Sequence, residues 1–270
     1  MLLLNEEYLV VSKANSNTLE VFSAVSLEPL FRHESPSPVT AVEQYQNSLI
    51  VGNEEGKIVM LVGFLSEGVV QLTQKLQWHV HAVSALRVNG SYLYSAGEEG
   101  VVVVWHLREN RRDFLPRIGS SVTNIQLHSA TLYCFLADNS LRAIDLANDH
   151  ALTTYKLLLN PDAHLLAPSS RRLANGLLVR ASRRGDQLFL RGGPGRIQEL
   201  DLLSGINSEH LIVSRNYVSR LDAHLPAPHQ LTDLCLSRDG AHLAVAVQGE
   251  GCRSLRFYEV EGGLRLVSKV

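Results

Sequence analysis

Hydrophobic and polar positions alternate in short runs along residues 78–119. The first apolar run, at 83–88, ends in the polar turn Asn89-Gly90-Ser91, and two further runs carry the pattern to Trp105. Runs rich in β-branched and aromatic residues, joined by glycine-containing turns, predict an antiparallel meander of three strands. A fourth strand is expected near residues 114–118.

The pattern of the third run, a turn followed by alternating apolar residues, recurs six times along the chain. The intervals between the copies are 39, 44, 39, 56 and 58 residues. The first three match the period of about 40–45 residues that is typical of propeller blades, and the extra residues of the last two should lie in rim loops. The last residues of the six copies are Phe22, Leu61, Trp105, Ile144, Leu200 and Tyr258.

Each copy follows apolar segments that suit the inner strands of a blade. These segments are apolar on both faces, as expected where neighbouring blades pack against both sides of a sheet. Trp78-His79 stands at the Gly-His entry of a WD-type blade, Val104-Trp105 at its Trp-Asp end, and Asp138 in a turn. Second strands are predicted near 8–11, 48–52, 92–97, 131–135, 187–190 and 242–246. First strands are predicted near 39–42, 83–86, 122–125 and 231–236.

The predicted fold class is all-β, a WD-repeat β-propeller of about six four-stranded blade units. The chain is expected to open on a second strand, without a first strand for its own blade, and to end after a fourth strand. Six blades could close imperfectly, but we favour a part of a longer tandem-propeller array. Prolines mark residues 150–174 and 204–228 as loops or inter-blade segments. The expected domains are 1–203, blades of a first propeller; 204–228, a linker or long loop; and 229–270, a further blade that starts a second propeller.

Composition describes an ordinary globular protein, with 45% hydrophobic and 19% charged residues in a chain of 270. The net charge of −2 argues against a molecule that binds polyanions over its whole surface. Residues 1–107 hold 5 Lys and Arg against 11 Asp and Glu, and residues 108–270 hold 20 against 16, so any polyanion contact would be local.

Cysteine usage and the N-terminal residues predict a soluble protein that is not secreted and does not contact membranes. The three cysteines are an odd number without CxxC spacing, which favours reduced, buried thiols inside the cell. The leucine run after Met1 lacks a basic region and is too short for a signal peptide. No apolar run approaches the length of a transmembrane helix.

Candidate sites for metals and catalysis are weak. His79-Val80-His81 would place two imidazoles on one face of a strand, but no third ligand lies at a supporting spacing. We therefore expect a hydrogen-bonded blade-entry histidine. Gly192-Gly193-Pro194-Gly195 precedes a predicted strand, which favours a turn over a phosphate loop. No catalytic motif is present, and we expect no enzyme activity, metal, cofactor or small-molecule substrate.

Clustered arginines are the one functional lead in the residues themselves. Guanidinium forks suit phosphates, so the clusters could hold an RNA backbone or an acidic partner. The alternative is a solvated rim whose charges neighbouring blades balance. No aromatic interleaving indicates base stacking, so sequence-specific RNA recognition is not expected. The first cluster is Arg171, Arg172, Arg180, Arg183, Arg184, Arg191 and Arg196, and the second is Arg108, Arg111 and Arg112 with Arg117.

Several motifs together resemble one family, the WD-repeat subunit of the UtpA (t-UTP) complex in the U3-containing small-subunit processome. The most specific is Phe114-Leu115-Pro116-Arg117 after a strand that ends in tryptophan, with the Trp78-His79 entry before it. Ala96 departs from the family's Ser-Gly-Gly turn. The matched segments are 52–58, 76–79, 93–105, 113–120, 138–141, 188–198 and 212–220.

The resemblance implies a nucleolar scaffold for early pre-rRNA (18S) processing, with a link to rRNA transcription. It implies as partners other WD-repeat processome proteins, and pre-rRNA or U3 snoRNA bound through phosphates. Two alternatives remain open: a WD-repeat adaptor of another complex, such as a ubiquitin ligase or a trafficking coat, and a propeller enzyme with polar groups in a central channel. The blade residues singled out by the repeat and the resemblance are Trp78, His79, Trp105, Phe114, Pro116, Arg117 and Asp138.

Overall fold

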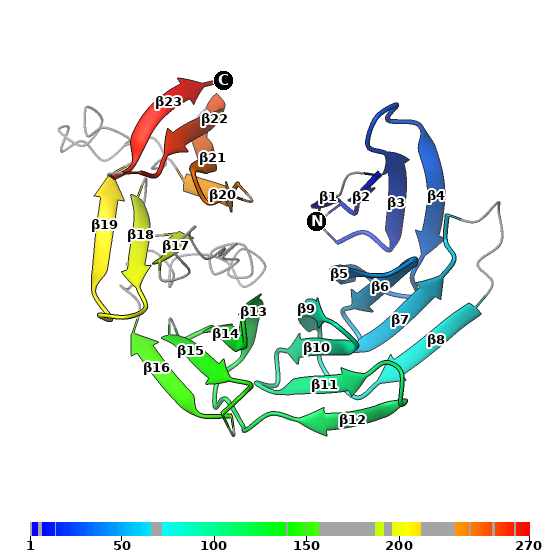
Figure 1. The fold of residues 1–270 in the computed structure, drawn as a ribbon. Helices are drawn as coiled ribbons and strands as arrows, with labels where there is room; N and C mark the ends of the chain where they lie inside the picture. Colours follow the sequence, from blue (N-terminus) through cyan, green and yellow to red (C-terminus); the bar gives the residue numbers. More distant parts are fainter. Residues whose placement is uncertain are drawn as a thin grey trace, which may run out of the picture. The chain divides into compact units, whose positions relative to one another are not determined.

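The computed structural model is built of antiparallel β-strands that pair with their neighbours in chain order (Figure 1). It describes residues 2–270 except 5–6, 14, 66–71, 139, 149, 157–186, 192–195, 212–229, 238, 250–251 and 262. The described strands form six sheets, five of four strands and one of three. This repeated meander confirms the predicted all-β fold of propeller-type blade units.

The first three sheets hold twelve strands, which are coloured blue to green in Figure 1. Sheet 1 consists of β1 (Leu2–Leu4), β2 (Tyr8–Val11), β3 (Thr18–Ser23) and β4 (Pro29–Glu34). Sheet 2 consists of β5 (Val39–Tyr45), β6 (Ser48–Asn53), β7 (Lys57–Val62) and β8 (Leu72–Gln77). Sheet 3 consists of β9 (Val83–Asn89), β10 (Tyr92–Gly97), β11 (Val102–His106) and β12 (Arg111–Phe114).

The other three sheets follow the same order. Sheet 4 consists of β13 (Val122–His128), β14 (Thr131–Leu136), β15 (Ser140–Asp145) and β16 (Leu152–Lys156). The described strands of sheet 5 are β17 (Gln187–Arg191), β18 (Arg196–Asp201) and β19 (Asn207–Leu211). Sheet 6 consists of β20 (Gln230–Leu236), β21 (His242–Gly249), β22 (Cys252–Glu259) and β23 (Arg265–Lys269).

The chain divides into two compact units. One comprises residues 1–127 with 148–150, and the other comprises 128–147 with 151–270. The division of the chain into domains at residues 203 and 229 stays a prediction.

Sheet 2 shows how period-2 alternation builds the core of the first unit. Along β6, Leu49 and Val51 pack with sheet 1, whereas Ile50 packs with sheet 3. All three are almost fully buried, because successive side chains of a strand point to opposite faces. At Gly52 an added Cβ would lie 2.8 Å from Cγ1 of Val83, so only glycine lets the two sheets approach this closely.

The same alternation organises the second unit. Leu188 and Leu190 of β17 pack with Phe135 of β14, whereas Phe189 between them packs with the strands of sheet 6, including Leu243 of β21. Each of these five side chains is at most 1% exposed. Truncating one of the buried leucines to alanine would cost about 2–5 kcal/mol, so these faces account for much of the stability of the sheets.

Three expectations from the sequence are wrong at the outer strands and the first strand. A first strand is present, because β1 pairs with residues 9–11 of β2. The fourth strand of sheet 3 is Arg111–Phe114 and not 114–118, since Pro116 has no N–H for a ladder and the chain turns inward to bury Leu115 and Ile118. Two segments expected as loops contain the outer strands β16 and β19.

Candidate functional site

The third sheet contains a chain of buried hydrogen bonds that joins its entry loop to its strands. The indole N–H of Trp105 donates to Oγ of Ser95 at 2.8 Å, and Ser95 lies 2.7 Å from Nε2 of His79. Nδ1 of His79 contacts the carboxylate of Glu99. The network therefore ties β10, β11 and the loop before β9 together.

The indole N–H of Trp105 determines which group donates and which accepts in each of these hydrogen bonds. An indole N–H can only donate, so the Ser95 hydroxyl accepts from Trp105 and gives its own hydrogen to Nε2 of His79. The imidazole is then the tautomer with hydrogen on Nδ1, which donates to Glu99. Burial lowers the pKa of His79 from its ordinary value, although the hydrogen bond and charge of Glu99 act in the opposite direction. A lowered pKa favours the neutral form of the His79 imidazole, which is the form that this hydrogen-bond pattern requires.

Glu99 depends on a glycine two residues before it. The carboxylate folds back against Gly97, where any Cβ would collide with both of its oxygens and with its carboxyl carbon. Gly97 also closes the turn, since its carbonyl accepts the N–H of Gly100 at 3.2 Å. A side chain at residue 97 would therefore push Glu99 away from His79.

The outer strand β12 sorts its charges between two faces. Directly paired residues of antiparallel strands share a face, and β12 pairs Arg111 with His106 and Arg112 with Trp105. Asp113 accordingly lies on the Arg111 face and Phe114 on the Arg112 face. All four residues of β12 are exposed, so both faces of the strand are open to a partner.

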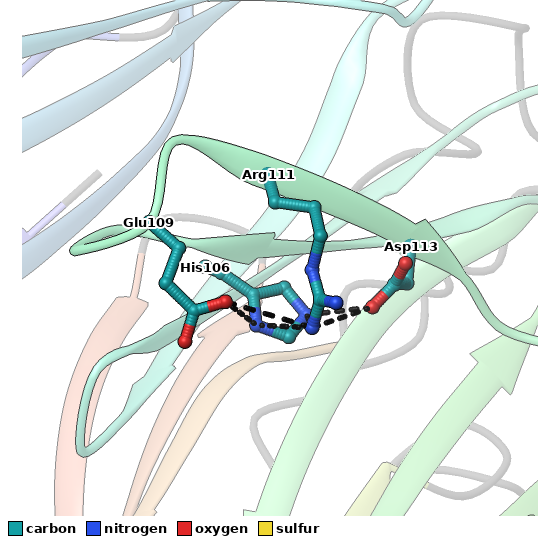
Figure 2. A network of polar contacts seen from close by, with 4 residues as sticks. All are labelled: His106, Glu109, Arg111 and Asp113. Carbon is teal, nitrogen blue, oxygen red and sulfur yellow. Dashed lines mark hydrogen bonds and ion pairs between the residues drawn. The ribbon is translucent and has the colours of Figure 1, made fainter.

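On the first face, four side chains form the polar network of Figure 2. Nε2 of His106 lies 2.7 Å from Oδ2 of Asp113, and Nη2 of Arg111 lies 3.2 Å from Nδ1 of the same ring. Arg111 also approaches Glu109 at 3.7 Å and Asp113 at 3.6 Å. Tyr92 covers the imidazole of His106 edge to face, with ring centres 4.8 Å apart. Two carboxylates thus balance the charge of Arg111.

On the second face, an arginine lies beside aromatic rings. The ring centres of Phe114 and Trp78 are 4.9 Å apart, and Phe114 remains 49% exposed. Arg112 makes a long contact of 3.5 Å from its guanidinium to the carbonyl oxygen of Gln77. We call Trp78, Arg112 and Phe114 the aromatic–arginine platform. Within the described residues, no carboxylate lies within ion-pair distance of Arg112, nor of the exposed Arg108 and Arg117.

The first arginine cluster lies largely outside the described residues. Arg171, Arg172, Arg180, Arg183 and Arg184 fall in 157–186, and only the backbone of Arg191 is described, in β17. Arg196 is half-buried at the start of β18 and has an interaction partner.

Other singled-out residues occupy simpler positions. Pro116 is exposed in the loop after β12. Asp138 caps a turn, because its Oδ1 accepts hydrogen bonds from the backbone N–H of Ser140 at 3.1 Å and from the hydroxyl of Ser140 at 2.6 Å. Gly192-Gly193-Pro194-Gly195, expected to form a turn, lies outside the described residues.

The expectation of two histidines on one strand face is wrong. Residues 78–82 form a bend between β8 and β9, in which His79 is buried and His81 is exposed. In the part of the chain with described coordinates, no three His, Cys, Asp or Glu side chains are grouped to hold a metal ion. The described portion also has no helix long and apolar enough to cross a membrane.

Only one of the three cysteine side chains can be placed. Cys134 is a buried free thiol, and burial raises its pKa to about 12, so the unreactive thiol form persists at neutral pH. Cys235 and Cys252 have no described side chains.

Several residues of this site escaped the sequence argument. Ser95, Gly97 and Glu99 were seen only as strand and turn residues, and Tyr92 only as part of a second strand. The available signal for these residues was their fixed spacing from His79 within the repeat. The aromatic contact of Trp78 with Phe114 joins residues 36 positions apart and had no local signal.

Comparisons with known proteins agree with the repeat and motif interpretation. No protein-family model matches the chain. "U3 small nucleolar RNA-associated protein 17" of Schizosaccharomyces pombe is 39% identical over 119 residues, 42% of this chain and 14% of that protein. "WD repeat-containing protein 75" of Xenopus laevis is 29% identical over 178 residues, 64% of this chain and 20% of that protein. The chain thus spans a fifth or less of the length of these two relatives.

Among solved structures, the WD40 repeats of RRP9 superpose with a TM-score of 0.70 and 14% identity. The match covers 97% of this chain and 77% of that one, and it establishes the WD-repeat fold. The two curated relatives confirm the resemblance that the motifs indicate.

Proposed function

Because the chain is similar to a U3 small nucleolar RNA-associated protein and to WD repeat-containing protein 75, we propose that it acts as a scaffold in ribosome biogenesis. In this role it helps to assemble the small-subunit processome for early processing of pre-rRNA toward 18S rRNA in the nucleolus. A link to rRNA transcription belongs to the same proposal. The observation that carries it is the 39% identity to the U3-associated protein of S. pombe.

The proposed mechanism is presentation and not catalysis. Buried sheet faces hold each blade rigid, and exposed residues of the hairpin between β11 and β12, such as 108–110, offer side chains to partners. The outer edge of sheet 3 supports this role, because Trp, Tyr, Phe and Arg residues gather there, and such residues are typical of binding hot spots. The proposed partners are other WD-repeat proteins of the processome.

RNA is a second proposed partner of the same scaffold. Arg108, Arg112 and Arg117 are exposed and free of carboxylate partners among the described residues, so their charge is available to phosphates. Arg111 is a poorer candidate, because Glu109 and Asp113 balance its charge. Within the first cluster, RNA contact by Arg171, Arg172, Arg180, Arg183, Arg184, Arg191 and Arg196 stays a sequence-based proposal.

Affinity purification of the tagged full-length protein from nuclear extract tests the proposed function. We expect U3 RNA and WD-repeat processome proteins to copurify, and fluorescence microscopy to place the protein in the nucleolus. Recovery of ubiquitin-ligase or trafficking-coat subunits without U3 RNA would replace the proposal with the adaptor function.

A further inference from the structure

We infer that the aromatic–arginine platform on β12 binds single-stranded RNA, with one base stacked on Phe114 and the adjacent phosphate held by Arg112. The inference rests on the proposed function for the identity of the nucleic acid as RNA. To the proposed function, the inference adds a defined RNA-binding site and a mode of RNA recognition.

Strand geometry creates the positive charge of the platform. Asp113 lies between Arg112 and Phe114 in sequence, but its side chain belongs to the opposite face, where it is 2.7 Å from His106. The platform face therefore carries the cation and the ring without the acid that separates them in the sequence. A face with this composition attracts a polyanion, whereas the opposite face is neutralised by its own carboxylates.

The aromatic part of the platform is rigid. Trp78 packs edge to face on His79, with ring centres 5.5 Å apart, and the ring of His79 is fixed on both nitrogens by Ser95 and Glu99. Phe114 is fixed by its pairing with Val103 and by its contact with Trp78. A pre-positioned ring loses little conformational entropy when a base stacks on it, which favours binding.

Half-exposure of the ring indicates a single strand as the ligand. Bases in a duplex are stacked on each other and offer their faces only at the ends, whereas unpaired bases can be splayed onto an aromatic side chain. Phe114, at 49% exposure, leaves part of its ring for one such base. Stacking on Phe114 and a phosphate contact by Arg112 do not depend on which base is bound, so we expect little sequence preference.

Fluorescence anisotropy with a labelled single-stranded RNA of about 12 nucleotides tests the inference on the purified full chain. We expect Phe114→Ala to weaken binding at least about fivefold, as is typical when one stacking ring is lost. Phe114→Leu should weaken it similarly, because leucine keeps the apolar volume but not the aromatic face. Arg112→Gln should lower affinity and reduce the slope of log affinity against log salt by about 1.

The matched control is Arg111→Gln, which removes an exposed guanidinium from the opposite face of the same strand and should change affinity less than about twofold. Unchanged thermal unfolding of the four variants shows that the sheet stays folded. Equal losses for Phe114→Ala and Arg111→Gln, or equal affinity for a blunt duplex, would overturn the inference. So would a wild-type chain that binds no RNA while Phe114→Ala removes a processome protein from the purification.

The two proposals fail separately. If purification recovers no U3 RNA or processome protein but the Phe114 variants still lose RNA affinity, the site stands and the ribosome-biogenesis function does not. If purification succeeds and the variants bind RNA normally, the function stands and the platform is not its RNA site.

Discussion

Sheets 2 and 3 have the same strand order but stabilise their entry loops differently. In sheet 3, His79, Ser95 and Trp105 form a buried polar chain. The repeat places Val51 and Leu61 at the positions of Ser95 and Trp105, and both pack in the apolar core against sheet 1.

The entry turn of sheet 2 is held by Asn53 at the position of Gly97. Its side-chain oxygen accepts the N–H groups of Glu55 at 3.1 Å and Lys57 at 2.9 Å, and its amide donates to Ser35 at 3.4 Å. Ser35 occupies the position of His79 in the repeat. The comparison teaches that one backbone plan accepts either apolar residues or hydrogen-bonded polar residues at these positions.

The largest effect should come from removing the end of the polar chain. Trp105→Ala deletes a buried indole and leaves Ser95 without its donor, so we expect a loss of about 3–5 kcal/mol in the free energy of unfolding. Urea denaturation measures it, with the exposed Val25→Ala as the control, which should change stability by less than about 0.5 kcal/mol. A loss below about 1 kcal/mol for Trp105→Ala would contradict the buried position.

A second substitution sharpens the comparison at the turn. Gly97→Ala should destabilise by about 1–3 kcal/mol, because its Cβ displaces Glu99 and leaves His79 short of an acceptor. Glu99→Asp in the same chain should restore part of the loss, since the shorter side chain withdraws from that Cβ. A double-mutant cycle in chemical denaturation measures the coupling. Strictly additive losses would show that residues 97 and 99 are independent.

The pH dependence of stability should distinguish the two entry loops. Burial lowers the pKa of His79 in the folded state, so below about pH 6.5 the unfolded chain binds more protons at this residue. This contribution to stability is present above that pH and is lost as the pH falls toward the folded pKa. The slope cannot exceed about 1.4 kcal/mol per pH unit for one proton.

The measurement is thermal or urea unfolding from pH 7.5 to 5 for the wild type, His79→Gln and the exposed His81→Gln. Removing His79 should flatten the profile, and the exposed His81→Gln serves as the control for losing an imidazole elsewhere in the same bend. His33, whose pKa burial also lowers, is present in all three proteins and cancels in the differences. Parallel profiles for the wild type and His79→Gln would refute the assignment.

The smallest effect is expected on the exposed network of Figure 2. Glu109→Gln removes a contact of 3.7 Å to Arg111 between side chains that are 63% and 58% exposed. Solvent screens such pairs, so stability should change by less than about 0.5 kcal/mol, and less still in high salt. A larger, salt-independent loss in urea denaturation would mean that this network has a structural role like that of the buried one.

Inner strands were predictable from the sequence because they are buried on both sides. The alternation of apolar residues placed every third strand and every second strand that the structure describes, including β6 and β10. Among the outer strands, the final one, β23, agrees with the expected fourth strand, whereas β12 was placed wrongly because it has no buried residue and therefore no hydrophobic period for a pattern to detect. Pro116 prevents the strand from continuing beyond Phe114, whereas the apolar residues at 114–118 had suggested a strand there.

The site divides in the same way. His79 and Trp105 were recognisable from the repeat, since both stand at fixed distances from the third strand. Glu99 and the contact between Trp78 and Phe114 depend on how a turn folds back and how separate segments meet, which spacing in one sequence does not encode. In the sequence, the basic and acidic residues of β12 follow one another without an evident order. The pairing register with β11 shows which of them share a face of the strand.

Both tryptophans of the chain belong to sheet 3, Trp78 to its entry loop and Trp105 to its third strand, β11. Intrinsic fluorescence is therefore a local optical probe, whose emission reports the surroundings of sheet 3 against a background of tyrosines elsewhere. A ligand that stacks on Phe114, 4.9 Å from the ring centre of Trp78, should quench that signal without any attached dye.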